Sequence, residues 1–174
     1  MGKKFNYDLD FDTTDFRARP ELYRIGVGEQ GVLLVQPYKG ELLPFWRFKT
    51  EEIAQESAEK LYKMFEQYLE KEDFVGADMA RKYIQMGFTR ARRYANHPSG
   101  RKYTEGDDPE HDQKEYPYSS GSPRKGNELL PRAQDAATSE KAKAAAIFKG
   151  YWDRCRAHPD YQRQKAAFRE KYYF

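Results

Sequence analysis

The chain has 174 residues, a formal net charge of +3 and a single cysteine. This length suits one domain, and one cysteine excludes both an intramolecular disulfide and a cysteine-rich zinc site. No apolar stretch approaches the roughly 18 residues of a membrane span, and the amino terminus lacks a signal-peptide core, so we expect a soluble cytoplasmic protein.

Aromatic residues supply much of the apolar surface, with 14 Tyr, 11 Phe and 2 Trp, and they predict an aromatic core. The charges are unevenly distributed. Residues 1–80 contain 11 basic and 16 acidic groups, whereas residues 81–174 contain 20 basic and 12 acidic groups. This asymmetry indicates one basic face, which fits a nucleic-acid or nucleotide partner and is also compatible with ordinary solubility.

Extended structure is predicted for parts of the first fifty residues. Apolar and acidic residues alternate over 7–11, which is the period of a half-buried strand. Residues 31–35 predict a buried strand, and residues 42–48 a second one, after a turn over 38–41. Pro44 favours an edge or bulge position for the second strand. Together these segments predict a small antiparallel hairpin or sheet.

Two helices are predicted next from caps and apolar spacing. Thr50 is a candidate N-cap for a helix that ends near Glu70, and Asp73 is a candidate N-cap for one that ends at Asn96. The short link between them predicts antiparallel packing.

Residues 97–132 predict a long, charged loop rich in Pro and Gly, which lies within a single domain of residues 1–174. Thr138 or Ser139 then begins a third long helix that places Cys155 on its apolar stripe, and Pro159 begins a last helix. The predicted fold class is α+β: a mostly helical single domain with a small amino-terminal antiparallel β-hairpin.

Three glycines at positions 26, 28 and 31 have the spacing of a dinucleotide fingerprint. That fingerprint needs a helix directly after it, so that the phosphates meet the helix amino terminus, but a strand is predicted here. A glycine loop between two strands occurs over the nucleotide in protein kinases, but the other kinase motifs are missing. We interpret the glycines as turn residues.

Acidic clusters raise the question of a metal site. Residues 8–15 contain four aspartates, but Thr13 and Arg19 stand where a calcium loop needs Gly and Glu. Residues 107–112 offer carboxylates and one imidazole, a composition that is more often solvated loop charge. We predict no metal site and no cofactor.

The strongest functional pattern is a basic run without any acid between residues 81 and 102: Arg81, Lys82, Arg90, Arg92, Arg93, Arg101 and Lys102. Aromatic residues interleave it, which is typical of surfaces that bind phosphate groups and bases. Cations also complement the carboxyl end of a helix, so a purely structural role explains part of the run.

Five segments of the sequence carry a family resemblance: LDF at 9–11, RPELYRIG at 19–26, GEQGVLLV at 28–35, WRFKT at 46–50 and MGFTRARRYANH at 86–97. Together they resemble the domain of unknown function 4385 family, from about residue 5 to the carboxyl terminus. The resemblance implies one intact domain and assigns no activity, cofactor or catalytic residue.

The leading hypothesis is a phosphate- or polyanion-binding domain whose partner is RNA or DNA. Its predicted anion-binding residues are Arg90, Arg93, His97, Arg101 and Lys102, and its predicted stacking residues are Tyr94 and Tyr103. One alternative is a small enzyme that acts on a nucleotide or phosphorylated metabolite, with His97 as acid or base and residues 104–126 as a lid. A second alternative is a protein-interaction module with exposed aromatic residues.

Overall fold

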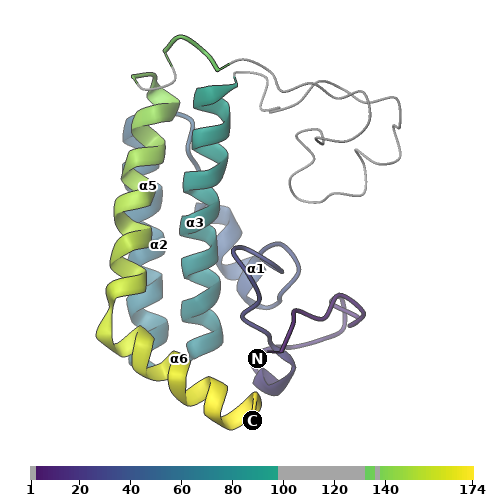
Figure 1. The fold of residues 1–174 in the computed structure, drawn as a ribbon. Coiled ribbons are helices and arrows are strands. Elements are labelled where there is room, and N and C mark those ends of the chain that lie inside the picture. Colours follow the sequence, from purple (N-terminus) through teal and green to yellow (C-terminus); the bar gives the residue numbers. More distant parts are fainter. Residues whose placement is uncertain (1–2, 98–131, 136–137) are drawn as a thin grey trace, which may run out of the picture.

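The computed structural model describes residues 3–97, 132–135 and 138–174. Three long helices lie side by side: α2 (Glu51–Glu70), α3 (Phe74–Asn96) and α5 (Glu140–Ala157). Helix α6 (Pro159–Tyr172) crosses the foot of this bundle (Figure 1). Between residues 3 and 50 the chain forms only short elements: the 3-10 helices η1 (Pro20–Leu22) and η2 (Leu43–Phe45), and α1 (Tyr38–Leu42).

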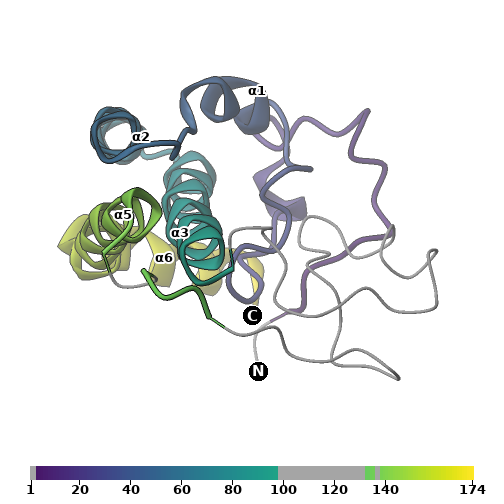
Figure 2. The same ribbon diagram turned by 90° about the horizontal axis from the view of Figure 1, so that it is seen from above.

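Helix α3 is the central element. Seen from above, α2 and α5 lie on one side of it, and α1 and the amino-terminal segment lie on the other (Figure 2). It contacts α1, α2, α5 and α6. Most of its side chains over its first four turns are therefore buried, including three charged ones, which matters for the site below.

The four predicted long helices are confirmed, and their first residues explain why they begin where they do. Thr50, Asp73 and Ser139 are the N-caps of α2, α3 and α5. Each side-chain oxygen accepts a hydrogen bond from the backbone N–H three residues on, at 3.2, 3.0 and 3.2 Å respectively. Pro159 occupies the first turn of α6, where proline is tolerated because the N–H groups of that turn have no partner within the helix.

The core is aromatic, as predicted. The largest fully buried rings belong to Phe16, Tyr23, Tyr38, Phe65, Tyr83 and Phe148. They come from the amino-terminal segment and from α1, α2, α3 and α5, so one continuous core joins the irregular part of the chain to the bundle. Cys155 is also buried in it, as its position on the apolar stripe indicated.

The predicted β-hairpin is wrong, and the fold class is helical rather than α+β: the ranges that the structure describes contain no strand. Residues 31–35 form turns instead. The N–H groups of Val32, Leu34 and Val35 bond to carbonyls only three or four residues back, at 3.0, 2.9 and 3.2 Å. Gly31, with φ of +80°, supplies the left-handed conformation that starts this turn. The apolar run is buried as a compact turn, so it needs no partner strand.

The second predicted strand, over residues 42–48, is replaced by the end of α1 and by η2, and the predicted turn before it is α1 itself. Pro44 lies in the first turn of η2, a position that tolerates proline. Ser57 of α2 satisfies the backbone beyond it, because its hydroxyl donates to the Phe45 carbonyl at 2.7 Å and accepts from Arg47 N–H at 3.0 Å. Residues 7–11 also form turns rather than a strand.

Candidate functional site

The basic run does not form one surface. Its first two members, Arg81 and Lys82, are buried inside the fold at 7% and 0% exposure. Asp78, one turn before them on α3, is also fully buried and faces both, with Oδ1 2.6 Å from Arg81 Nη2 and Oδ2 3.9 Å from Lys82 Nζ. These two cations therefore belong to the interior and are excluded from any anion-binding face.

Tyrosines from distant segments complete the buried network. The hydroxyl groups of Tyr23 and Tyr161 both donate to the Asp78 carboxylate, the latter at 2.6 Å. Burial alone would raise the pKa of Asp78, but the charges of Arg81 and Lys82 and the two tyrosine hydrogen bonds outweigh it and lower the pKa to about 2. Burial lowers the pKa of Lys82 to about 7, with Asp78 offsetting only part of the effect.

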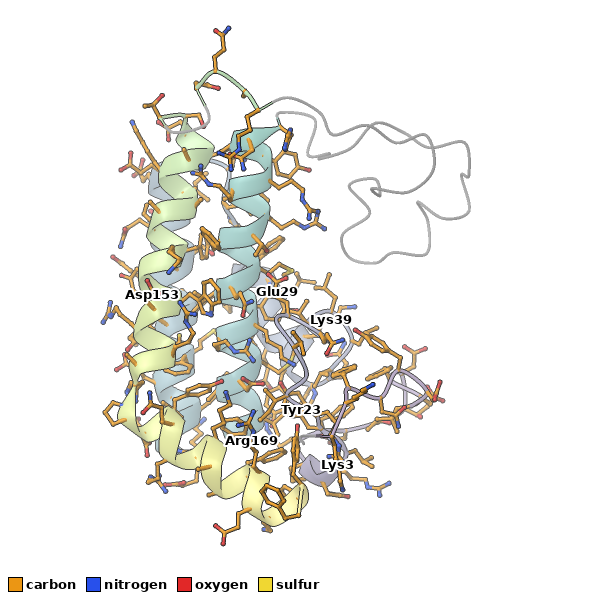
Figure 3. All side chains as sticks on the ribbon, in the orientation of Figure 1. Lys3, Tyr23, Glu29, Lys39, Asp153 and Arg169 are labelled. Atoms are coloured by element: carbon orange, nitrogen blue, oxygen red, sulfur yellow. The ribbon has the colours of Figure 1, made fainter. Side chains whose placement is uncertain are left out.

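The glycine loop is held by this network through its carbonyl groups. Arg81 donates to the carbonyl of Gly28 at 2.6 Å, and Lys82 donates to that of Gln30 at 2.6 Å. Figure 3 labels Tyr23 and Glu29 on the segment that lies along α3. The glycines at 26, 28 and 31 all have positive φ, which supports their interpretation as turn residues.

Three of the predicted site residues lie in the last turns of α3, and a fourth caps it. At about 100° per residue, Arg90, Arg93 and Tyr94 fall within an arc of roughly 100° on the helix surface, and His97 follows directly after the helix as its C-cap. Arg90, Arg93 and Tyr94 are half-buried. The other predicted residues, Arg101, Lys102 and Tyr103, lie outside the described residues.

Two lysines from other segments join this end of α3. Lys141, at the start of α5, places its ammonium over the rings of Phe48 and Tyr94, 4.8 and 5.7 Å from their centroids. Its pKa is lowered by burial and by the neighbouring charge of Lys49. We refer to Lys49, Arg90, Arg93, Tyr94 and Lys141 as the basic end.

Arg92 has a structural role within the same turns. Its guanidinium donates to the Ala142 carbonyl of α5 at 3.4 Å and to the Asn96 side chain at 3.5 Å. It therefore ties the end of α3 to the beginning of α5.

His97 ends α3 and is buried, with 6% of its surface exposed. Its backbone N–H donates to the Arg93 carbonyl at 2.8 Å. Among the described residues, its Nδ1 has no hydrogen-bond partner. His97 is therefore a buried residue at the end of α3 rather than an exposed one.

An acidic hollow bounds the basic end on one side. It is lined by residues from the amino ends of α2 and α5, with Glu51, Glu52, Glu56 and Glu140 among them. A polyanion would be repelled at this hollow.

The chain matches the family described as Domain of unknown function (DUF4385) over residues 6–171. It belongs to this family. No curated protein and no solved structure matches it.

The DUF4385 chain brings together residues that the sequence interpretation missed. Lys49 and Lys141 are 92 positions apart in the numbering, so no local spacing could connect them. The burial of Asp78 was also missed. Two basic residues within one turn of a lone Asp on an apolar helix could have indicated a buried ion pair. Within the described ranges, no group of His, Cys, Asp or Glu is arranged to hold a metal ion, and no helix is long and apolar enough to cross a membrane.

Proposed function

We propose that the domain binds the phosphate backbone of nucleic acid through the basic end. The observation that carries the proposal is the position of Lys141, which lies over two aromatic rings beside Lys49 and on the same end as the arginines of α3. Cations from three separate segments, together with aromatic rings, are what a backbone-tracking surface needs. Arg101, Lys102 and Tyr103 extend the same pattern in the sequence.

Binding of a phosphate between Lys49 and Lys141 also has a physical advantage. Each ammonium group repels the other, and this repulsion contributes to the lowered pKa of Lys141. A phosphate oxygen that contacts both removes the repulsion and replaces the lost hydration of Lys141. Affinity should therefore fall steeply with salt concentration, since condensed counterions are released on binding.

The test is fluorescence anisotropy with labelled single-stranded RNA, single-stranded DNA and duplex DNA at several salt concentrations. We expect the double variant Lys49→Ala/Lys141→Ala to bind more weakly and to reduce the salt slope by roughly 2, about one for each lost phosphate contact. Arg93→Ala combined with Arg101→Ala tests the arginine part of the surface in the same way.

The matched control is Lys4→Ala/Lys63→Ala, which removes the same charge from exposed positions away from the basic end. It should retain the affinity of the unaltered protein. No association with any of the three nucleic acids at low salt, or an equal loss in the control, would show the proposal to be wrong. The enzyme and protein-interaction alternatives stay predictions.

A further inference from the structure

A pocket of about 520 Å³ lies at the other end of α3 from the basic end. It is formed by the amino-terminal segment, the turn that joins α2 to α3, and α6. Its volume is within the range of small-molecule sites. Because α3 has 23 residues, the two ends are roughly 30 Å apart, so the pocket is separate from the proposed nucleic-acid surface.

Part of the pocket lining is apolar and aromatic. Phe74 of α3 and Phe168 of α6 line it, with their ring centroids 5.1 Å apart, and both side chains are otherwise buried. Tyr172 and Ala167, on the same helix as Phe168, also line the pocket. A flat apolar group placed here would gain contact with rings that already pack closely.

The charged lining has a surplus of cations. Arg17 and Arg163 are already neutralised, the first by Glu41 at 2.7 Å and the second by Glu72 at 2.7 Å. The remaining cations of the lining are Lys71, at the end of α2, and Lys171, near the end of α6.

Within the described ranges, neither lysine has an ion-pair partner, and both are exposed. The pocket also lies at the amino end of α3, where the helix dipole favours negative charge. Its Asp73 carboxylate accepts hydrogen bonds from the Tyr38 hydroxyl and the Gly76 N–H and pairs with Arg17 at 3.4 Å. The Glu41 carboxylate also attracts Lys71, so Lys171 and the amino end of α3 supply most of the remaining attraction for an anion.

One buried polar atom of the lining is unmatched. Gln164 is 4% exposed, and its amide nitrogen donates to the Leu69 carbonyl at 2.9 Å and to the Asp160 carboxylate at 3.1 Å. Its Oε1 has no hydrogen-bond partner in the described part of the chain. This oxygen is itself buried, so a ligand in the pocket meets it only if the Gln164 side chain turns toward the pocket.

We propose that this pocket binds a small aromatic anion, a flat ring that carries a phosphate or a carboxylate. The ring lies against Phe74 and Phe168, and the anionic group lies between Lys71 and Lys171. The site needs both parts of the ligand, because the aromatic lining contributes apolar contact and the lysines contribute charge.

The experiment measures amide chemical-shift changes in ¹⁵N-labelled full-length protein during titration with phenyl phosphate and with benzoate. Inorganic phosphate and phenol serve as half-ligands that have only the charge or only the ring. We expect phenyl phosphate, benzoate or both to shift signals of residues 71–75 and of α6, with each half-ligand binding at least about tenfold more weakly, equivalent to ~1.4 kcal/mol.

Two variants test the two halves of the site. Lys71→Ala/Lys171→Ala should weaken binding about tenfold, whereas Lys4→Ala/Lys63→Ala should leave it unchanged. Ala167→Trp places a large ring in the pocket from an exposed position and should abolish binding, with the melting temperature confirming that the variant is folded. The proposal is overturned if neither aromatic anion shifts these signals, if inorganic phosphate binds equally well, or if folded Ala167→Trp binds normally.

Discussion

Arg81 and Asp78 form a buried ion pair one turn apart on α3, with Arg81 Nη2 2.6 Å from Asp78 Oδ1. The same arginine donates to the Gly28 carbonyl, and the same aspartate accepts from Tyr161 of α6. This pair therefore connects the amino-terminal segment and the carboxyl-terminal helix to the centre of the bundle. It explains how a segment without regular structure over most of its length is held in one conformation.

The first prediction concerns the carboxylate of this pair. Asp78→Asn leaves the buried Arg81 without a counter-charge and favours the neutral form of Lys82, so we expect the free energy of unfolding to fall by about 3–5 kcal/mol. Urea denaturation followed by circular dichroism measures it. Asp153→Asn is the control, because Asp153 lies on the outer side of α5 and pairs with exposed Lys149 (Figure 3). It should cost no more than about 1 kcal/mol. Equal effects of the two substitutions would mean that the buried network contributes little.

The second prediction is a pH dependence due to Lys82. In the folded protein its pKa is lowered to about 7 by burial, from an ordinary value of 10.5. Between these values the unfolded chain binds a proton that the folded chain has released, so the free energy of unfolding rises with pH in this window. Lys82→Met lacks this contribution.

We therefore expect the stability difference between the unaltered protein and Lys82→Met to increase in favour of lysine from pH 7 to 9. Urea titrations at several pH values measure it. Tyr23 and Cys155 have raised pKa values and change stability in the opposite direction at higher pH, but they are present in both proteins and cancel in the difference. A difference that stays constant with pH would contradict the assignment.

The third prediction concerns backbone strain at Gly28 in the glycine loop. Gly28 has φ of +61°, and an added Cβ would meet only Gln85, at 3.7 Å. Gly28→Ala should therefore cost roughly 1–2 kcal/mol through backbone strain alone, and Gly28→Asn should cost less, because asparagine tolerates this conformation better. Thermal unfolding of the two variants measures the order. Equal stability of alanine and asparagine would contradict the strain argument.

The helices could be predicted because their signals are local. Thr50, Asp73 and Ser139 each bond to a backbone group three residues away, so a short window of sequence contains the whole interaction. The strands could not be excluded in this way. Residues 31–35 have strand-like composition, but their conformation depends on Gly31 and on the cations of α3 some fifty positions later.

The candidate site also has a part that follows from local sequence and a part that depends on distant contacts. The stripe of Arg90, Arg93 and Tyr94 follows from helix geometry and was predictable. The burial of Arg81 and the approach of Lys141 depend on contacts with other segments, and these appear only in the folded chain. The charge pattern of the sequence therefore placed Arg81 on a basic surface to which it does not belong, and it missed Lys141, which does belong to it.

The last prediction uses two helical glycines with opposite surroundings. Gly87 of α3 lies against the ring of Phe148 of α5, where an added Cβ would overlap the ring, whereas at Gly150 of α5 nothing lies within 4 Å. Alanine favours a helix over glycine by about 1 kcal/mol. Gly150→Ala should therefore stabilise the protein by up to about 1 kcal/mol, as measured by urea denaturation.

Gly87→Ala gains the same helix propensity but forces α3 and α5 apart in a closely packed core, so we expect a net loss of about 1–3 kcal/mol. The double variant Gly87→Ala/Phe148→Leu tests the cause. A smaller side chain at position 148 should relieve the overlap, so that alanine at 87 costs less in this background than in the unaltered protein. If the cost of Gly87→Ala is the same in both backgrounds, contact with Phe148 is not the reason for glycine at this position.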